Sequence, residues 1–222
     1  MRFRSALPYY LQSLPTLLFQ TNPLVIPAIF LHSPQLLKLK GHFPLYIDRF
    51  MDIWTAKEVV LDNQYQRFHS VPSNATVIDV GASIGDFSIM VSHRAKQVFA
   101  CEMDPNRLGY LTTNIRLNER PNIQILPGQV KSLAPIFTQY HLRHCDFLKI
   151  DCEGNEYGIL ADTPDKTLEQ IRYIAAEVHF FTPAMRTAYR DLCHRLTKLG
   201  YTLKELPNAV HANIAFLFAT LS

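Results

Sequence analysis

Features that mark several classes of protein are missing from this sequence of 222 residues. It has only four cysteines and no C-x-x-C pair, so neither a disulfide scaffold nor a cysteine zinc site is expected, and a reducing cytosol suits these thiols. No run of like charge exceeds two residues and no basic stripe is visible, which argues against a nucleic-acid partner. Hydrophobic residues make up 48% and charged residues 18%, which excludes a disordered chain. We therefore expect a cytoplasmic globular protein of one domain plus an appendage.

Charge is also missing from one long stretch near the amino terminus. Residues 5–37 contain no Asp, Glu, Lys or Arg, but prolines interrupt every apolar run. A membrane-spanning helix needs roughly 20 mostly apolar residues, and proline in a helix interior costs about 3 kcal/mol. We expect two short helices, near residues 7–20 and 23–32, that pack on the main domain. The alternatives are a membrane-surface contact through residues 5–37, which is less favoured, and a targeting segment.

The following residues, up to residue 70, complete an N-terminal region. Apolar and polar residues alternate over 35–40 and 42–48 around Gly41, as in a hairpin. Apolar residues then recur at helical spacing, which predicts an amphipathic helix over 48–65. Turn-forming residues at 71–74 (VPSN) separate this region, residues 1–70, from a main domain over residues 71–222.

Strand-like and helix-like segments alternate through the main domain. Such alternation predicts a parallel sheet with helices on both faces. The link between the last two strands is too short for a crossover, so the last strand should be antiparallel. Seven strands with an antiparallel last one is the layout of Rossmann-like class I methyltransferases, although a fold does not settle function. The predicted strands are 75–80, 97–101, 122–126, 146–150, 171–178, 201–206 and 213–220, and the predicted helices are 84–94, 105–118, 133–141, 155–160 and 183–199.

The first strand of this domain runs into a turn that contains two glycines. Gly81 and Gly85 lie where the backbone must turn sharply and approach a ligand closely. Their G-x-x-x-G spacing differs from the G-x-G-x-x-G that holds a pyrophosphate. Asp79 and Asp86 add negative charge, which would repel a dinucleotide phosphate and favour the ammonium and sulfonium of S-adenosylmethionine.

An acidic residue follows at the carboxyl end of the next strand. Glu102 is placed to accept hydrogen bonds from both ribose hydroxyls, whereas Asp104 is better placed as the cap of the following helix. We therefore predict S-adenosylmethionine as the cofactor. The predicted cofactor-binding residues are Asp79, Gly81, Ala82, Gly85, Asp86, Glu102, Met103 and Gln129.

Two motifs in this sequence resemble the FkbM-type family of S-adenosylmethionine-dependent methyltransferases. Residues 79–86 (DVGASIGD) match its first motif, and residues 147–156 (FLKIDCEGNE) match its K-I-D-x-E-G-x-E segment. Residues 51–58 and 177–179 also look like that family, so the resemblance runs from about residue 35 to the end. It implies methyl transfer, usually to oxygen, on small metabolites, sugars or glycans. Residues 125–137 depart from the family, which usually has a longer segment there, and this leaves the substrate range open.

Acidic residues and a histidine end two neighbouring strands. In an open sheet of this type, ligands lie outside the carboxyl ends of the strands. Asp151 and Glu153 follow one strand and, if extended, project to the same side; Glu177 and His179 do so on the next strand. Methyl transfer to an alcohol needs alignment and the removal of one proton. We take Asp151 or His179 as the candidate base and Glu153 as the group that orients the acceptor.

Other interpretations of this cluster stay open. Carboxylates and imidazole suit magnesium or manganese, but we assign no metal ligand from the sequence. Glu153 could instead cap the following helix, and His179 could be a hydrogen-bonded core histidine. For the whole protein, our prediction is an S-adenosylmethionine-dependent methyltransferase that acts on a hydroxyl of a small metabolite, sugar or glycan. The alternatives are a non-catalytic S-adenosylmethionine-binding module that has lost its substrate loop and, less favoured, a nicotinamide oxidoreductase.

Overall fold

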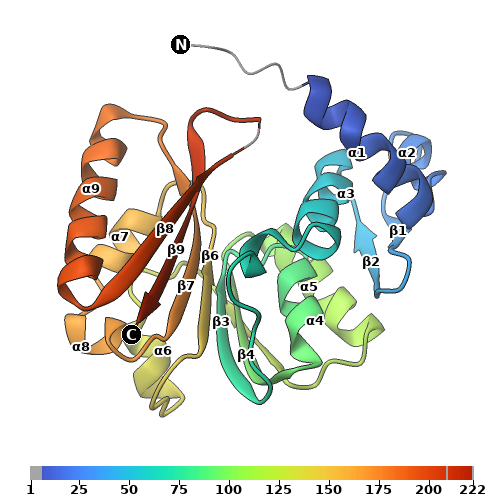
Figure 1. Ribbon diagram of the computed structural model, residues 1–222. Coiled ribbons are helices and arrows are strands. Elements are labelled where there is room, and N and C mark those ends of the chain that lie inside the picture. Colours follow the sequence, from blue (N-terminus) through green and yellow to red (C-terminus); the bar gives the residue numbers. More distant parts are fainter. Residues whose placement is uncertain (1–6, 209, 222) are drawn as a thin grey trace.

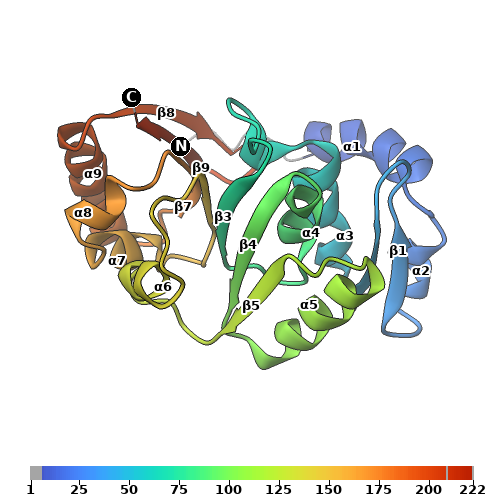
Figure 2. The same cartoon turned by 90° about the horizontal axis from the view of Figure 1, so that it is seen from below.

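A seven-stranded sheet forms the centre of the protein, with helices on both of its faces (Figure 1, Figure 2). The computed structural model describes residues 7–208 and 210–221, so the first six residues of the predicted N-terminal region lie outside the described residues. The strand order is β5-β4-β3-β6-β7-β9-β8, and β9 runs in the direction opposite to the other six strands. The predicted fold class is confirmed. The strands are β3 (Ala75–Val80), β4 (Ala95–Glu102), β5 (Ile123–Pro127), β6 (Phe147–Ile150), β7 (Tyr173–His179), β8 (Tyr201–Pro207) and β9 (Ile214–Leu221).

Two helices of the main domain, α5 and α9, begin at the caps that the sequence predicts. The Asp104 side chain accepts a hydrogen bond from the Asn106 N–H at 2.8 Å, and Thr182 accepts one from the Met185 N–H at 3.3 Å. Only α8 was not predicted, because four residues are too few to show a helical period. The helices are α4 (Asp86–Ser92), α5 (Pro105–Leu117), α6 (Ala134–Gln139), α7 (Glu156–Ala161), α8 (Asp165–Leu168) and α9 (Pro183–Lys198).

The N-terminal region consists of short elements that pack beside α4 and α5. The predicted helix over 48–65 is broken into three pieces, because its middle widens into a π-helical turn and Asn63 then adopts a left-handed backbone (φ 54°). The second predicted helix is also shorter than expected. The elements are α1 (Leu7–Gln20), α2 (Val25–Ala28), β1 (Gln35–Lys38), β2 (Pro44–Ile47), α3 (Phe50–Ala56), the π-helical η1 (Lys57–Leu61) and the 3-10 turn η2 (Gln64–Gln66).

This region shares its core with the sheet. Leu17, Ile53 and Tyr65 belong to the same buried apolar cluster as Val77 and Phe147. Across the described residues, no helix combines the length and the apolar character that crossing a membrane would need. The less favoured membrane-surface contact stays a prediction.

Candidate active site

The turn after β3 packs directly against the end of β6. Gly81 and Gly85 both have left-handed backbones, with φ of 77° and 93°. A Cβ atom on Gly81 would lie 1.7 Å from the carbonyl oxygen of Asp151, so only glycine fits. The N–H groups of Gly81 and of the buried Ala82 donate to the Cys101 carbonyl at 3.0 and 2.9 Å. The glycine is therefore required by the contact between the turn and β6 before any ligand is considered.

A buried ion pair lies beneath this turn. Lys149 Nζ is 3.1 Å from Asp79 Oδ1 and donates to the Gly81 carbonyl at 2.6 Å. Burial would lower the pKa of Lys149, but the surrounding carboxylates outweigh it and raise the pKa. Asp79 has no exposed surface and also accepts from Ser88 Oγ at 2.7 Å. Its predicted direct contact with the cofactor does not fit this placement, because Asp79 supports the turn from behind through Lys149.

Asp86 is a second buried carboxylate near the turn. It opens α4, is 4% exposed, and its Oδ1 accepts from the Phe87 N–H at 2.6 Å. Its Oδ2 is buried and has no hydrogen-bond partner among the described residues. Burial raises the pKa of Asp86 to about 6, and the charge of Lys149 partly opposes the shift. Asp86 thus lies too deep to repel a phosphate at the surface, although it could serve a ligand that reaches this depth.

Glu102 connects the glycine turn to the end of β4. Its Oε2 accepts from the Ser83 N–H at 2.7 Å, and its Oε1 accepts from the N–H groups of Met103 and Asp104, both at 2.8 Å. A carboxylate oxygen can accept two hydrogen bonds, so Oε2 keeps capacity for a hydroxyl. The role of Glu102 as the ribose partner stays a prediction, and these contacts are compatible with it.

A cavity of about 520 Å³ lies beside the carboxyl ends of β4 and β5. Its size is within the range of small-molecule sites. Gln129 contributes to its wall, whereas Met103 is 58% exposed and is not among the lining residues. A contact of either residue with the cofactor stays a prediction. The turn, Glu102 and this cavity together fit an adenosyl group bound at the carboxyl edge of the sheet. Other lining residues are Cys101, Leu126, Val130, Ile136 and Tyr140.

The predicted acidic cluster does converge, at the carboxyl ends of β6 and β7. Single ligand atoms of Asp151, Glu177 and His179 all lie within 4.8 Å of one another. Burial, together with repulsion from Asp151, raises the pKa of Glu177 to about 8. Tyr65, from η2, donates to Asp151 Oδ2 at 2.8 Å and lies 3.3 Å from Glu177 Oε2. Tyr65 was not predicted as a site residue, because its apolar spacing resembles that of a core position.

His179 is held by a carboxylate that the sequence analysis did not assign. Its Nδ1 is 2.8 Å from Glu156 Oε1, and its ring is 2% exposed. Burial would lower the pKa of His179, but Glu156 and the other carboxylates raise it. Glu156 Oε1 also accepts from the N–H groups of Cys152 and Gly154, at 3.2 and 3.1 Å. Glu156 is thus the residue that orders the turn and orients the histidine.

Glu153 lies beside the cluster, but its backbone conformation differs from the predicted one. The extended backbone expected after Asp151 is wrong, because Glu153 has a left-handed backbone (φ 54°) within a turn. Its side chain is 83% exposed, yet its Oε2 lies 3.8 Å from His179 Nε2. Its role in orienting an acceptor stays a prediction, from a place at the rim of the cluster.

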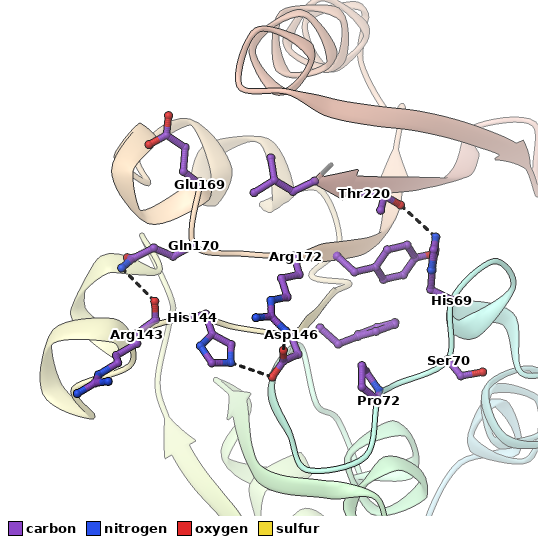
Figure 3. A pocket seen from close by; sticks show the side chains of 13 residues that line it. His69, Ser70, Pro72, Arg143, His144, Asp146, Glu169, Gln170, Arg172 and Thr220 are labelled. Carbon is purple, nitrogen blue, oxygen red and sulfur yellow. Dashed lines mark hydrogen bonds and ion pairs between the residues drawn. The ribbon is translucent and has the colours of Figure 1, made fainter.

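Another cavity, of about 550 Å³, lies at the other end of the strands from the candidate site (Figure 3). Its lining comes from the amino ends of β6 and β7 and from the end of β9. Asp146 binds Arg172 at 2.8 Å and lies 3.4 Å from His144, so the carboxylate of Asp146 is already paired. Ligands of open α/β sheets bind at the carboxyl ends of the strands, so this cavity is not the candidate site.

Two family models match the chain. The methyltransferase FkbM domain matches residues 115–203, and the TRM5/TYW2 methyltransferase domain matches residues 52–139. The predicted resemblance to the FkbM-type methyltransferases is therefore confirmed over residues 115–203. The predicted cofactor, S-adenosylmethionine, is the cofactor of these families and is confirmed.

Relatives and a solved structure extend this assignment. The tRNA (guanine(37)-N(1))-methyltransferase Trm5b of Pyrococcus abyssi is 33% identical over 66 residues, which are 30% of this chain and 20% of that protein. An uncharacterized RNA methyltransferase of Halalkalibacterium halodurans is 28% identical over 166 residues, 74% of this chain and 34% of that protein. The chain thus spans at most about a third of these relatives. The structure of M. jannaschii TYW2 in complex with AdoMet shares the fold with a TM-score of 0.54 at 18% identity, over 85% of each chain.

The prediction that nucleic acid plays no part is contradicted by these relatives. Two of them are named as RNA methyltransferases, and one of the matching family models is a TRM5/TYW2 domain. The prediction rested on the absence of a basic stripe along the sequence. Folding can bring basic residues from separate segments together, so a linear charge pattern was not a sufficient reason.

Proposed function

We propose that this chain transfers a methyl group from S-adenosylmethionine to a hydroxyl of a sugar, a glycan or another small polar acceptor. The bound cofactor would supply an electrophilic methyl carbon. The observation that carries the proposal is the position of Asp151. Its backbone touches the glycine turn at Gly81, while its side chain belongs to the cluster with Glu177 and His179. The cluster therefore lies where an acceptor would meet the cofactor.

The geometry favours His179 over Asp151 as the group that removes the proton. A ring N–H at Nδ1 that donates to Glu156 leaves a lone pair at Nε2, which points toward Glu153 and Glu177, both 3.8 Å away. An imidazolium formed there would be stabilised by these carboxylates. Asp151, held by Tyr65, would orient the acceptor together with Glu153.

RNA is the second candidate acceptor. It is supported by the relatives named as tRNA and RNA methyltransferases and by the TRM5/TYW2 match over residues 52–139. The two candidate acceptors differ in charge. The three carboxylates of Asp151, Glu153 and Glu177 suit an uncharged polyol better than the phosphodiester of RNA.

The proposal is tested by binding first and by transfer second. Calorimetry should show saturable binding of S-adenosylhomocysteine and none of NAD; the reverse would assign the chain to the oxidoreductases. Methyl-labelled cofactor is then supplied with a panel of sugars and small alcohols and, separately, with transcribed tRNA. Label on RNA alone would replace the first candidate by the second. Firm cofactor binding without any acceptor would favour the non-catalytic binding module.

A variant then tests the assigned base. His179→Gln should lower turnover by about a hundredfold or more, the usual scale for a lost general base, with little change in S-adenosylhomocysteine affinity. The matched control is Asp191→Asn, an exposed position on α9. Equal turnover in both variants would remove His179 from this role.

A further inference from the structure

The geometry points to a divalent metal-ion site formed by Asp151, Glu177 and His179 at the carboxyl ends of β6 and β7. The three ligand atoms lie within 4.8 Å of one another. Ligands at about 2.1 Å from one ion lie about 3 Å apart at right angles and at most about 4.2 Å apart, so the three side chains would have to move closer by up to about 2 Å. Oxygen ligands suit magnesium and manganese, and imidazole suits the first-row transition metals, so Mn²⁺ fits this mixed set best.

The histidine supplies a second, independent observation. His179 is 2% exposed, and its Nε2 points into the cluster without a hydrogen-bond partner among the described residues. Its Nδ1 contacts the carboxylate of Glu156, which has no exposed surface. A metal-binding histidine almost always donates its second ring N–H to such a carboxylate or carbonyl, which fixes the tautomer and directs the free lone pair at the ion. Glu156 is itself held by two backbone N–H groups.

His179 is the only side chain that can carry a positive charge within 4 Å of the cluster carboxylates among the described residues. Within residues 7–208 and 210–221, no lysine or arginine nitrogen lies within 4 Å of Asp151 or Glu177. The nearby Lys149 is used by Asp79 and by the Gly81 carbonyl. The carboxylates of Asp151 and Glu177 lie close enough to repel each other when both are ionised. An ion with two positive charges would remove this repulsion.

The hydrogen bonds of Tyr65 leave room for the ion. Its hydroxyl engages Asp151 Oδ2 and Glu177 Oε2, so the other oxygen of each carboxylate stays available. Glu177 Oε1 is the atom that lies 3.8 Å from His179 Nε2. An ion at this point would occupy the Nε2 lone pair of His179. It would then replace His179 as the group that assists loss of the proton, because a metal ion lowers the pKa of a hydroxyl held beside the glycine turn. That catalytic use rests on the proposed function, whereas the binding of the ion does not.

The site is tested with Mn²⁺ as the probe on the full chain, after treatment with a chelator. Electron paramagnetic resonance of free Mn²⁺ and calorimetry should both give one ion per chain. Glu177→Gln and Asp151→Asn keep the side-chain shape and should each weaken Mn²⁺ binding at least tenfold. Asp191→Asn removes an exposed carboxylate elsewhere and should leave the affinity unchanged. Circular dichroism confirms that each variant is folded.

Two results would overturn the inference. One is the absence of saturable Mn²⁺ binding to the wild-type chain, and the other is an equal Mn²⁺ affinity in the wild type and both cluster variants. S-adenosylhomocysteine affinity is measured on the same samples. If S-adenosylhomocysteine binds but Mn²⁺ does not, the metal site is wrong and the proposed function stands. If Mn²⁺ binds but S-adenosylhomocysteine does not, the metal site stands and the proposed function is wrong.

Discussion

Single carboxylates at the candidate site hold the backbone around them through several hydrogen bonds. Glu102 accepts three backbone hydrogen bonds, from Ser83, Met103 and Asp104. Glu156 accepts two and also holds His179. Such residues cannot be read as ligand contacts alone, because their removal also releases the loops that form the site.

Glu102→Gln should weaken S-adenosylhomocysteine binding by about 10- to 100-fold, which corresponds to the roughly 1.5–3 kcal/mol of a hydrogen bond to a charged group. An amide keeps the shape but places an NH₂ where an oxygen accepts from backbone N–H groups or would accept from the predicted ribose. Calorimetry measures the affinity, and Glu119→Gln, an exposed position after α5, is the control. An unchanged affinity would show that Glu102 neither contacts the ribose nor shapes the turn.

The buried carboxyl of Asp86 should make stability depend on pH. Burial raises its pKa to about 6 in the folded chain, from the usual value near 3.8. A raised pKa of an acid means that its contribution to stability is present below about pH 4 and is lost as the pH rises through 6. Relative to Asp86→Asn, the wild type should lose on the order of 3 kcal/mol of unfolding free energy between these limits.

Urea unfolding at a series of pH values measures this difference. The comparison with Asp86→Asn isolates one group, because the other carboxylates are common to both proteins. A constant difference between the two proteins from pH 4 to pH 7 would contradict the raised pKa. Asp191→Asn, at an exposed carboxylate, should run parallel to the wild type.

At the scale of elements, local signals decided where the helices begin. Asp104 and Pro105 start α5, and the side chain of Asp104 binds the Asn106 N–H at 2.8 Å. Asp104→Ala should therefore lower the unfolding free energy by about 1 kcal/mol, whereas Asp104→Ser should lower it by less. Urea titrations of the three proteins give the comparison. Equal losses in both variants would mean that the cap is not what the side chain contributes.

At the scale of the whole molecule, the N-terminal region is joined to the sheet by buried polar contacts. Asn114 of α5 accepts from the Tyr46 N–H at 2.7 Å and donates to the Tyr46 carbonyl at 3.0 Å. Arg107 lies 2.6 Å from Asp48 and also pairs with Asp52, and the neighbouring carboxylates raise its pKa although burial opposes the shift. Such contacts, with a shared core, couple residues 7–70 to the main domain.

We therefore expect one cooperative unfolding transition. Trp54, the only tryptophan, lies on α3 and packs on Tyr10 of α1 with ring centroids 4.9 Å apart, so its fluorescence reports the N-terminal region. Far-ultraviolet circular dichroism is dominated by the larger main domain. The two signals should follow the same urea curve. A fluorescence transition at lower urea would show instead that the N-terminal region unfolds as a unit of its own.

The sequence by itself determined the order of the elements, the sheet class and the position of the cofactor turn. These follow from local physics: periodicity separates strands from helices, caps and glycines mark the ends, and a short link forces the antiparallel β9. The sequence also predicted that Asp151, Glu177 and His179 lie close together, because the carboxyl ends of parallel strands lie on the same side of the sheet.

Only the tertiary structure decided what each buried polar group does. Lys149 and Glu156 belong to the motif over residues 147–156, and Tyr65 has the spacing of a core residue. Their partners are 68, 23 and 86 residues away along the chain, so no local pattern could show what they bind. The same packing buried Asp79 against Lys149 and made glycine necessary at position 81, through a contact with Asp151. Burial and charge pairing depend on which segments meet in space, and that is the part of the site that spacing along a sequence does not encode.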